Sequence, residues 1–277
     1  MNKLKLAQLL EHFFIEDIGE RDVTSDSLFG KGTKGGIVFL AKDDGVFCGT
    51  DIIEVGFSVM DPTASVEMLV IDGETIQKGQ QLAVVHGNTA DLLKGERVVL
   101  NLIQHMSGIA TKTREAVTLL NSNKTKICDT RKTTPGLRML EKYAVTVGGG
   151  YNHRFGLYDA VMIKDNHIAF AGSIKNAVEI VRNQVGHMVK IEVETESKEQ
   201  VLEAVQANAD VIMFDNQSPS SIKELIQHVP THIITETSGG IKVQDLPNFS
   251  ETGVDYISLG CLTHSVAALD ISVKVKL

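Results

Sequence analysis

The chain has 277 residues, of which 43% are hydrophobic and 22% are charged, a composition typical of folded globular proteins and unlike that of disordered or fibrous chains. Its net charge of -8 argues against general binding to nucleic acid or to an anionic membrane surface, although a local cluster of cations can still bind a small anion. Three cysteines without a CxxC pair argue against a disulfide framework and favour a reducing, cytoplasmic location.

The first residues predict an amphipathic helix rather than a signal peptide. Leu6, Leu9, Leu10 and Phe13 fall on one helical face, and charged residues interrupt the apolar positions. No apolar run in the chain approaches the roughly 20 residues that a membrane-spanning helix needs. We therefore expect a protein without membrane partners.

Up to about residue 110, short apolar runs alternate with Gly and Asp punctuation, which predicts strands joined by turns. The expected strands are residues 36–41, 64–71 and 81–86. The expected helices are residues 9–14, 52–60 and 92–109. This half is typical of an α+β domain with an antiparallel sheet.

After residue 110 the pattern changes to a regular alternation of strands and helices. The expected strands are residues 126–129, 160–164, 189–194, 210–215, 232–236 and 255–259. Between them, Ser197 with Gln200 forms a capping box, and Ser218-Pro219 is a typical helix start. Consecutive βα units predict a parallel sheet, either open or closed into a barrel.

Polar and ionisable residues follow each of these six strands. They are Asp129 to Lys132, Lys164 to His167, Glu194, Asp215-Asn216, Glu236 to Gly240, and Gly260 to His264. The carboxyl ends of parallel strands lie at one face of a barrel, or line the crevice of an open sheet, and ligands bind there in both cases. The sequence therefore predicts one functional site at this face.

One group of these residues is cationic and predicts a pocket for a small polyanion, because arginine forks match carboxylates and phosphates. Its members are Arg97, Arg131, Lys132, Arg138, His153, Arg154 and Lys164. The alternative is that neighbouring acids neutralise them; these acids are Asp129, Glu141, Asp159 and Asp165. We favour the pocket because many cations gather in one stretch.

A second group is acidic: Glu192, Glu194 and Asp215, with Glu236 as a further candidate. Carboxylates on adjacent strand ends are the oxygen ligands that Mg²⁺ takes, with substrate phosphate and water completing its shell. Glu192 and Glu194 share one face of their strand because side chains repeat every second residue. The alternative is that these acids pair with the cations of the first group.

Glycine-rich turns form a third group. Ser238-Gly239-Gly240 and Gly260 follow strands, where backbone N–H groups can approach phosphate oxygens closely. Gly148-Gly149-Gly150 is more typical of a helix stop. No G-x-x-x-x-G-K-[ST] string is present, which excludes an ordinary P-loop NTPase. The residues alone indicate an enzyme that handles anions and phosphate.

The same residues resemble the quinolinate phosphoribosyltransferase family, also called nicotinate-nucleotide pyrophosphorylase (carboxylating). The strings that carry the resemblance, in order over nearly the whole chain, are Glu96 to Val98, Ser107 to Thr111, Asp129 to Arg138, Glu141 to Val145, Gly148 to Gly150, Asn152 to Arg154, Ile163 to Ile168, Glu192 to Glu194, Asp215-Asn216, Ser238 to Ile241 and Thr263 to Ser265.

The resemblance implies an incomplete parallel α/β barrel with an N-terminal α+β sandwich domain. The expected domains are residues 1–110, joined by a C-terminal strand in residues 268–277, and the catalytic barrel of residues 111–267. It also implies a Mg²⁺-dependent glycosyltransferase of the pentosyltransferase type that joins quinolinate to phosphoribosyl pyrophosphate with decarboxylation, giving nicotinate mononucleotide, pyrophosphate and CO₂ in NAD biosynthesis. The protein would work as a homodimer or higher oligomer.

Residue roles carried over from the family fall into two sets. Quinolinate would bind to Arg131, His153, Arg154 and Lys164, and to Arg97 supplied to the partner's site. Phosphoribosyl pyrophosphate would bind to Lys132, Glu194, Asp215, Ser238, Gly239, Gly260 and His264. Lys132, Glu194 and Asp215 would be catalytic, and the two acids would also bind the metal.

Two other readings compete with this one. A paralogue with the same fold, such as the molybdenum-transport-associated relatives, would act on another substrate, but the complete cationic set argues against it. A non-catalytic anion-binding module would not need Glu194 and Asp215, and both acids are present.

Overall fold

The computed structural model describes residues 1–30 and 32–276 and divides into two compact units. The N-terminal unit comprises Met1–Lys112, Met139–Gly149 and Val266–Leu277, and the barrel unit comprises Thr113–Arg138 and Gly150–Ser265. Within the described part of the chain, no helix has the length and apolar character that crossing a membrane requires.

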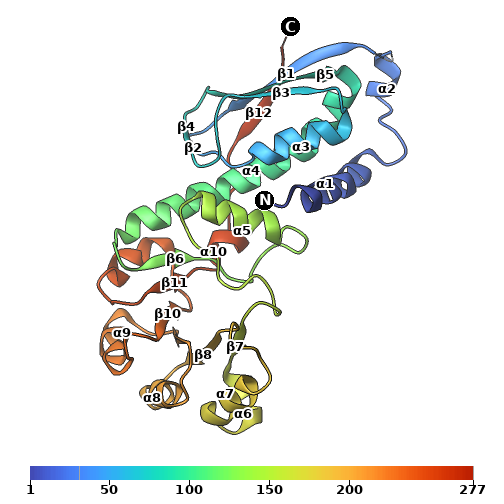
Figure 1. Cartoon of the computed structure of the whole chain (residues 1–277). Coiled ribbons are helices and arrows are strands. Elements are labelled where there is room, and N and C mark those ends of the chain that lie inside the picture. The colour runs from blue at the N-terminus through green and yellow to red at the C-terminus, as the bar shows by residue number, and fades with distance from the viewer. Residues whose placement is uncertain (31, 277) are drawn as a thin grey trace. The chain divides into compact units, whose positions relative to one another are not determined.

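A four-stranded antiparallel sheet is the centre of the N-terminal unit (Figure 1). Its order is β12 (Ile271–Lys276), β1 (Lys34–Ala41), β5 (Gln81–Asn88) and β3 (Ser65–Met68). The C-terminal strand therefore completes the sheet of the N-terminal unit, with Phe39 opposite Val273. A two-stranded ribbon pairs β2 (Gly45–Val46) with β4 (Thr75–Ile76).

Helices cover the apolar side of this sheet. They are α1 (Lys3–Ile18), the short α2 (Ser25–Leu28), α3 (Thr50–Met60) and α4 (Thr89–Leu120), of which residues up to Lys112 belong to this unit. Phe39 of β1 and Phe57 of α3 are both buried and pack edge to face, with ring centroids 6.0 Å apart. Leu6 and Leu10 of α1 are fully buried, which confirms the amphipathic helix.

Helix α5 (Arg138–Val147) belongs almost entirely to the N-terminal unit, whereas the expected domain boundaries placed it in the barrel. Its contacts explain the difference. The Tyr143 hydroxyl donates to Asp72 Oδ2 at 2.7 Å, and Glu141 Oε1 lies 2.8 Å from His105 Nε2. Because α5 is the next element after the first barrel strand, the order of elements along the sequence did not separate this helix from the barrel. The helix ends before Gly149, whose φ of 96° fits the expected helix stop.

Six parallel strands form the barrel unit. In sheet order they are β6 (Lys126–Cys128), β11 (Tyr256–Ser258), β10 (Ile234–Ser238), β9 (Val211–Asp215), β8 (Ile191–Thr195) and β7 (Val161–Ile163). All six lie where the sequence predicted strands. Tyr151 adds a single bridge beside Cys128, at the free edge of β6. Among the described residues β6 and β7 do not pair, so the barrel is incomplete, as expected.

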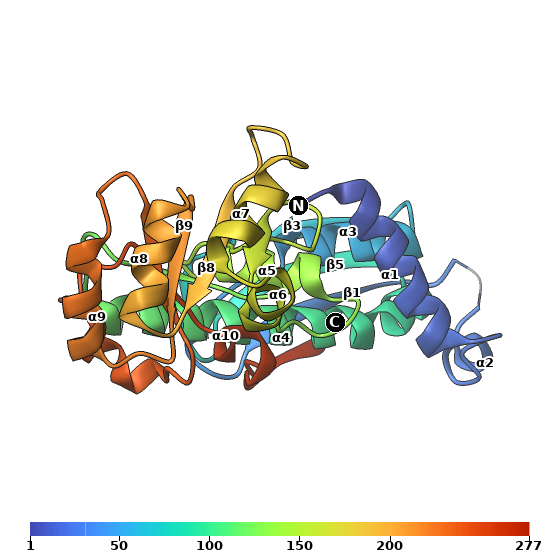
Figure 2. The ribbon, with the colours of Figure 1, turned by 90° about the horizontal axis from the view of Figure 1, so that it is seen from below.

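Helices connect these strands on the outside of the sheet (Figure 2). They are α6 (Asp165–Ala171), α7 (Ile174–Arg182), α8 (Lys198–Gln206), α9 (Pro219–Leu225) and the 3₁₀ segments η1 (Ile226–His228) and η2 (Val243–Phe249). The short α10 (Cys261–His264) follows the last barrel strand, β11. The Ser197 side chain accepts from the Gln200 N–H, and the Ser218 side chain accepts from the Ser221 N–H. Both predicted helix starts are therefore confirmed. The capping box is only half formed, because the Gln200 side chain accepts from the Glu196 N–H and not from that of Ser197.

Candidate functional site

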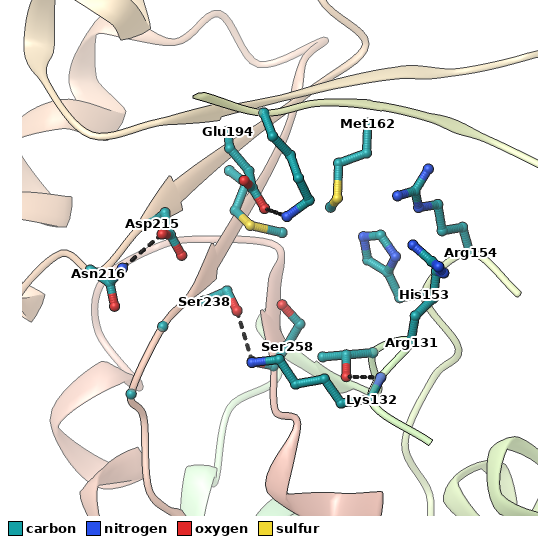
Figure 3. A pocket seen from close by; sticks show the side chains of 15 residues that line it. Arg131, Lys132, His153, Arg154, Met162, Glu194, Asp215, Asn216, Ser238 and Ser258 are labelled. Carbon is teal, nitrogen blue, oxygen red and sulfur yellow. Dashed lines mark hydrogen bonds and ion pairs between the residues drawn. The ribbon is translucent and has the colours of Figure 1, made fainter. Parts of the chain in front are cut away.

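A cavity of about 550 Å³ lies at the carboxyl ends of the parallel strands; we call it the main cavity (Figure 3). Most of the candidate residues line it: Arg131, Lys132, His153, Arg154, Lys164, Glu194, Asp215, Ser238 and Gly239. Strand register brings them together, because Glu194 lies opposite Met213 and Ser238 lies opposite Asp215 in neighbouring parallel strands. The predicted convergence of cations and acids at one end of the barrel is therefore present.

One side of the main cavity is cationic. Arg154 donates through Nη1 to the Ala160 carbonyl at 3.0 Å, while the buried Nε atoms of Arg131 and Arg154 have no hydrogen-bond partner among the described residues. Burial, and then the positive charge of Arg131, lower the pKa of the Arg154 guanidinium. Two guanidinium groups that repel each other and retain unused donors are suited to a bound anion.

Asp129, which follows β6, holds the neighbouring loop that contains Asn152 and His153. It is fully buried and accepts from the Asn152 side chain at 2.6 Å and from the His153 backbone N–H at 2.9 Å. Both acceptor oxygens thus hold the segment that carries His153 and Arg154. The carboxylate positions the cationic side of the cavity through the backbone.

The opposite side is acidic, with Glu194, Asp215 and Asn216 facing Arg131 and Arg154 in the close view (Figure 3). Lys164 Nζ lies 2.5 Å from Glu194 Oε1, and the Asn216 side chain donates to Asp215 Oδ2 at 2.7 Å. Lys164 is thus paired with an acid, so the main cavity contains both unpaired and neutralised cations.

Glu194 and Asp215 are also the residues best suited to a divalent cation. Both are partly exposed, and both line a smaller neighbouring cavity of about 240 Å³. In the described part of the chain they do not join a third His, Cys, Asp or Glu in a closed metal cage. Two carboxylates with open space around them fit Mg²⁺, which keeps water and substrate phosphate in its shell.

Glu192 and Glu236 were candidates for the same metal site as Glu194 and Asp215, but the structure places them apart from those two acids. They are only 5% and 4% exposed and do not line the main cavity. Glu192 Oε2 lies 2.9 Å from His153 Nε2, and Glu236 Oε1 lies 3.6 Å from the same atom. His153, Glu192 and Glu236 thus form a separate group of possible metal ligands, whose ligand atoms all lie within 4.8 Å of one another.

The Ser238–Gly240 turn closes another wall of the main cavity. Gly239 has a φ of 97°, and a side chain there would meet Asn216 Oδ1 at 2.2 Å. Gly240 also has a positive φ, of 63°. Only glycine fits this geometry without strain, and the resulting turn leaves space for a phosphate group close to the backbone.

Gly260 and His264 are not among the residues that line the main cavity, and His264 is exposed. A side chain on Gly260 would meet Lys132 Cδ at 2.9 Å and His264 Cδ2 at 3.1 Å. The Thr263 hydroxyl donates to the Lys132 carbonyl at 2.8 Å. These residues therefore position Lys132.

Arg97 is the candidate that the main cavity does not include. It lies on α4 in the N-terminal unit, with an exposed side chain. The cavity instead has lining residues that were not proposed as contacts: Thr130, Met162, Met213, Asn216 and Ser258. Asn216 followed a predicted strand end and could have been proposed. The two methionines carry no signal in the sequence that separates them from core residues.

Family models match both parts of the chain. The model described as quinolinate phosphoribosyl transferase, N-terminal domain, matches residues 22–107, and that described as the C-terminal domain matches residues 109–274. The chain is 57% identical over 277 residues to the probable nicotinate-nucleotide pyrophosphorylase [carboxylating] of Bacillus subtilis, covering 100% of this chain and 96% of that protein. It is 40% identical to the protein of the same description from Synechocystis, covering 96% and 91%.

Solved structures agree with these relatives. The crystal structure of NadC from Streptococcus pyogenes superimposes with a TM-score of 0.95 at 37% identity, covering 100% of this chain and 98% of that one. The nicotinate-nucleotide pyrophosphorylase from Francisella tularensis gives a TM-score of 0.94 at 33% identity, covering 100% and 98%. Two domain models that together span nearly all residues, and relatives similar over their whole length, establish that the chain belongs to the quinolinate phosphoribosyl transferase family.

Proposed function

We propose that this protein transfers the phosphoribosyl group of phosphoribosyl pyrophosphate to quinolinate and releases CO₂, giving nicotinate mononucleotide and pyrophosphate for NAD biosynthesis. One observation carries the proposal beyond family membership. Arg131 and Arg154 present unused guanidinium donors on one side of a cavity whose other side holds Glu194 and Asp215 (Figure 3). A dianionic acid and a metal-bound diphosphate need these two surfaces at a short distance from each other.

The cationic side would bind the two quinolinate carboxylates. Arginine forms paired hydrogen bonds with a carboxylate, and two arginines offer one fork for each carboxylate. His153, beside them, would contact the same ligand. This placement orients the pyridine ring so that its nitrogen faces the ribose carbon that loses pyrophosphate, which converts a bimolecular reaction into one between held groups.

The acidic side and the Ser238–Gly240 turn would bind phosphoribosyl pyrophosphate. Mg²⁺, held by Glu194 and Asp215, would supply positive charge for the leaving pyrophosphate. Lys132 extends past Gly260 into the same cavity and would stabilise charge as the bond to pyrophosphate breaks. The reaction belongs to the glycosyltransferases, of the pentosyl type. Attack by the ring nitrogen requires no protein nucleophile.

The direct test combines purified protein, quinolinate, phosphoribosyl pyrophosphate and Mg²⁺, and measures nicotinate mononucleotide together with CO₂. We expect both products in equal amounts, and no product after addition of a chelator until Mg²⁺ is restored. A paralogue with another substrate would leave quinolinate unchanged, and an anion-binding module would bind it without turnover. Activity that persists without any divalent cation would reject the metal assignment alone.

We also infer a homodimer in which Arg97 enters the main cavity of the partner subunit. The exposed guanidinium of Arg97 on α4 is available for such a contact. Mixing an Arg97→Ala variant with an Arg131→Ala variant tests the idea, because a mixed dimer would contain one intact site. Recovery of activity on mixing supports the shared site, and no recovery in a proven mixed dimer contradicts it.

The absence of a disulfide among the described residues is compatible with the cytoplasm.

A further inference from the structure

The barrel has a second cavity, of about 240 Å³, at the opposite end of its strands. Its lining includes the first residue of four strands: Val161 of β7, Val211 of β9, Ile234 of β10 and Tyr256 of β11. The main cavity, in contrast, lies where these strands end. The two cavities therefore enter the same barrel from its two ends.

The second cavity reaches from the surface to buried carboxylates. Tyr151 is 46% exposed and Lys190 is also exposed, whereas Glu192 and Glu236 at the other end of the lining are almost completely buried. A space of this size holds several water molecules, and carboxylate oxygens supply the polar partners that such waters need. Water can thus approach the two acids from the side of the barrel away from the main cavity.

His153 connects the two cavities, because it lines both of them. Its Nε2 atom is within 2.9 Å of Glu192 Oε2 and 3.6 Å of Glu236 Oε1. Oε1 of Glu192 and Oε1 of Glu236 are buried, and neither has a hydrogen-bond partner among the described residues. A histidine at the boundary, with two carboxylates behind it, is an arrangement for moving a proton between the two spaces.

The charge state of this cluster fits such a role. Burial, followed by the negative charge of Glu192, raises the pKa of Glu236 to about 7, and the charge of His153 opposes the shift. Asp129 and Ser258 also face Glu236, the acid raising its pKa and the hydroxyl lowering it. With a pKa of about 7, the Glu236 carboxyl is partly protonated near neutral pH and can donate a proton there.

The proposed reaction needs a proton at this place. Loss of the carboxylate next to the ring nitrogen breaks a carbon–carbon bond, releases CO₂ and leaves the electron pair on the ring carbon. That carbon must then gain one proton. Arg131, Arg154 and His153 line the main cavity together. Quinolinate held by the two arginines as proposed would place the carbon that loses CO₂ near the imidazole.

We propose that His153 and Glu236 form a proton route through the barrel, which supplies the hydrogen that replaces the departing carboxylate. The inference rests on the function proposed above. The ring carbon takes a proton from the His153 imidazolium, His153 regains one from Glu236, and Glu236 regains one from water in the second cavity. Each turnover thus consumes one solvent proton. Glu192 holds the imidazole in place, and Glu236 acts on the substrate through His153.

The test separates the two halves of the reaction in a Glu236→Gln variant. Rapid mixing with both substrates and Mg²⁺ measures pyrophosphate release and nicotinate mononucleotide formation in the first turnover. We expect pyrophosphate release within about twofold of the unmodified protein and nicotinate mononucleotide formation slowed tenfold or more. The pH dependence of the second step near pH 7 should disappear, and a Glu236→Asp variant, which keeps a carboxyl group, should restore part of it.

A matched control is Glu224→Gln, which changes an exposed acid on α9 in the same way. Its two rates should equal those of the unmodified protein. If both rates fall by the same factor in Glu236→Gln, or neither changes, the proton route is wrong.

Failure of the proposed function gives a different result, because the unmodified protein would then form no nicotinate mononucleotide from quinolinate. If Glu236→Gln does not fold, Val211→Phe provides a second variant. Its side chain fills the second cavity from the start of β9. The route predicts a slower second step with unchanged pyrophosphate release there too, and equal effects on both would overturn it.

Discussion

The two units of this protein treat their buried polar groups differently. In the N-terminal unit, Oδ1 of the half-buried Asp72 accepts from the N–H groups of Gly49 and Thr50 and from the Thr50 hydroxyl, and Oδ2 accepts from the Tyr143 hydroxyl. Of the six described buried side-chain atoms without a hydrogen-bond partner, five belong to the barrel unit. An unsatisfied buried group costs stability, so a cluster of them in one unit identifies the part shaped by ligand binding.

The largest effect that tests this comparison is expected for Arg154→Ala. The change removes about two charge-assisted hydrogen bonds to substrate, each contributing roughly 1.5–3 kcal/mol, so kcat/KM for quinolinate should fall about a hundred- to ten-thousandfold. Stability should stay the same or rise, because a repelled and partly unsatisfied cation is removed. Steady-state kinetics and thermal unfolding of the same sample measure both. Unchanged turnover in Arg154→Ala and Arg131→Ala would reject the pocket.

For Asp72→Ala in the N-terminal unit, we expect a loss of stability rather than a loss of activity. It removes the acceptor of four hydrogen bonds and leaves N–H and hydroxyl donors without their partner, so the free energy of unfolding should fall by about 2–3 kcal/mol. Urea denaturation measures the change. A Tyr143→Phe variant, which loses a single bond, should lose about 1 kcal/mol. If Asp72→Ala lowers activity without lowering stability, the contrast between the units fails.

A smaller, pH-dependent effect is expected for Glu236→Gln. Because the folded pKa of Glu236 is raised above its unfolded value, the folded state binds the extra proton between about pH 4.5 and 7, and stability is lost as pH rises through this window. The variant carries no such titration. Its stability relative to the unmodified protein should therefore improve between pH 5 and pH 8, on the order of 2 kcal/mol. Denaturation curves measure the difference in unfolding free energy between the two proteins at each pH. The same difference at pH 5 and at pH 8 would contradict this prediction.

The smallest change in unfolding free energy is expected at Ser197, a polar side chain of the barrel unit that has a hydrogen-bond partner. Ser197 caps α8 by accepting from the Gln200 N–H at 3.3 Å. Loss of such a cap costs about 1 kcal/mol, so Ser197→Ala should lower the unfolding free energy by that amount and leave kcat/KM unchanged. Ser197→Asp, which keeps an acceptor, is the matched control. A loss of activity in Ser197→Ala would show that satisfied groups of this unit also serve the site.

Sequence patterns predicted much of the barrel because each of its strands has a signal within a few consecutive residues. Each strand appears as an apolar run, and each run is followed by polar residues that parallel strands bring to one end; Glu194, Asp215 and Ser238 were located in this way. The resemblance to a known family added residue roles, which stay predictions until they are measured. Arg97 is the clearest case, since its role depends on a second subunit.

Tertiary structure alone decided the depth of each side chain and its partner. Glu192 and Glu194 share one face of β8, and period-two alternation cannot show that the first lies beside His153 in the barrel interior while the second faces the main cavity. The sequence likewise placed α5 with the strand before it. Its contacts with Asp72 and His105 join residues that are 71 and 36 positions apart. Local periodicity determines which face a residue occupies, whereas the partner it meets there depends on how distant segments pack.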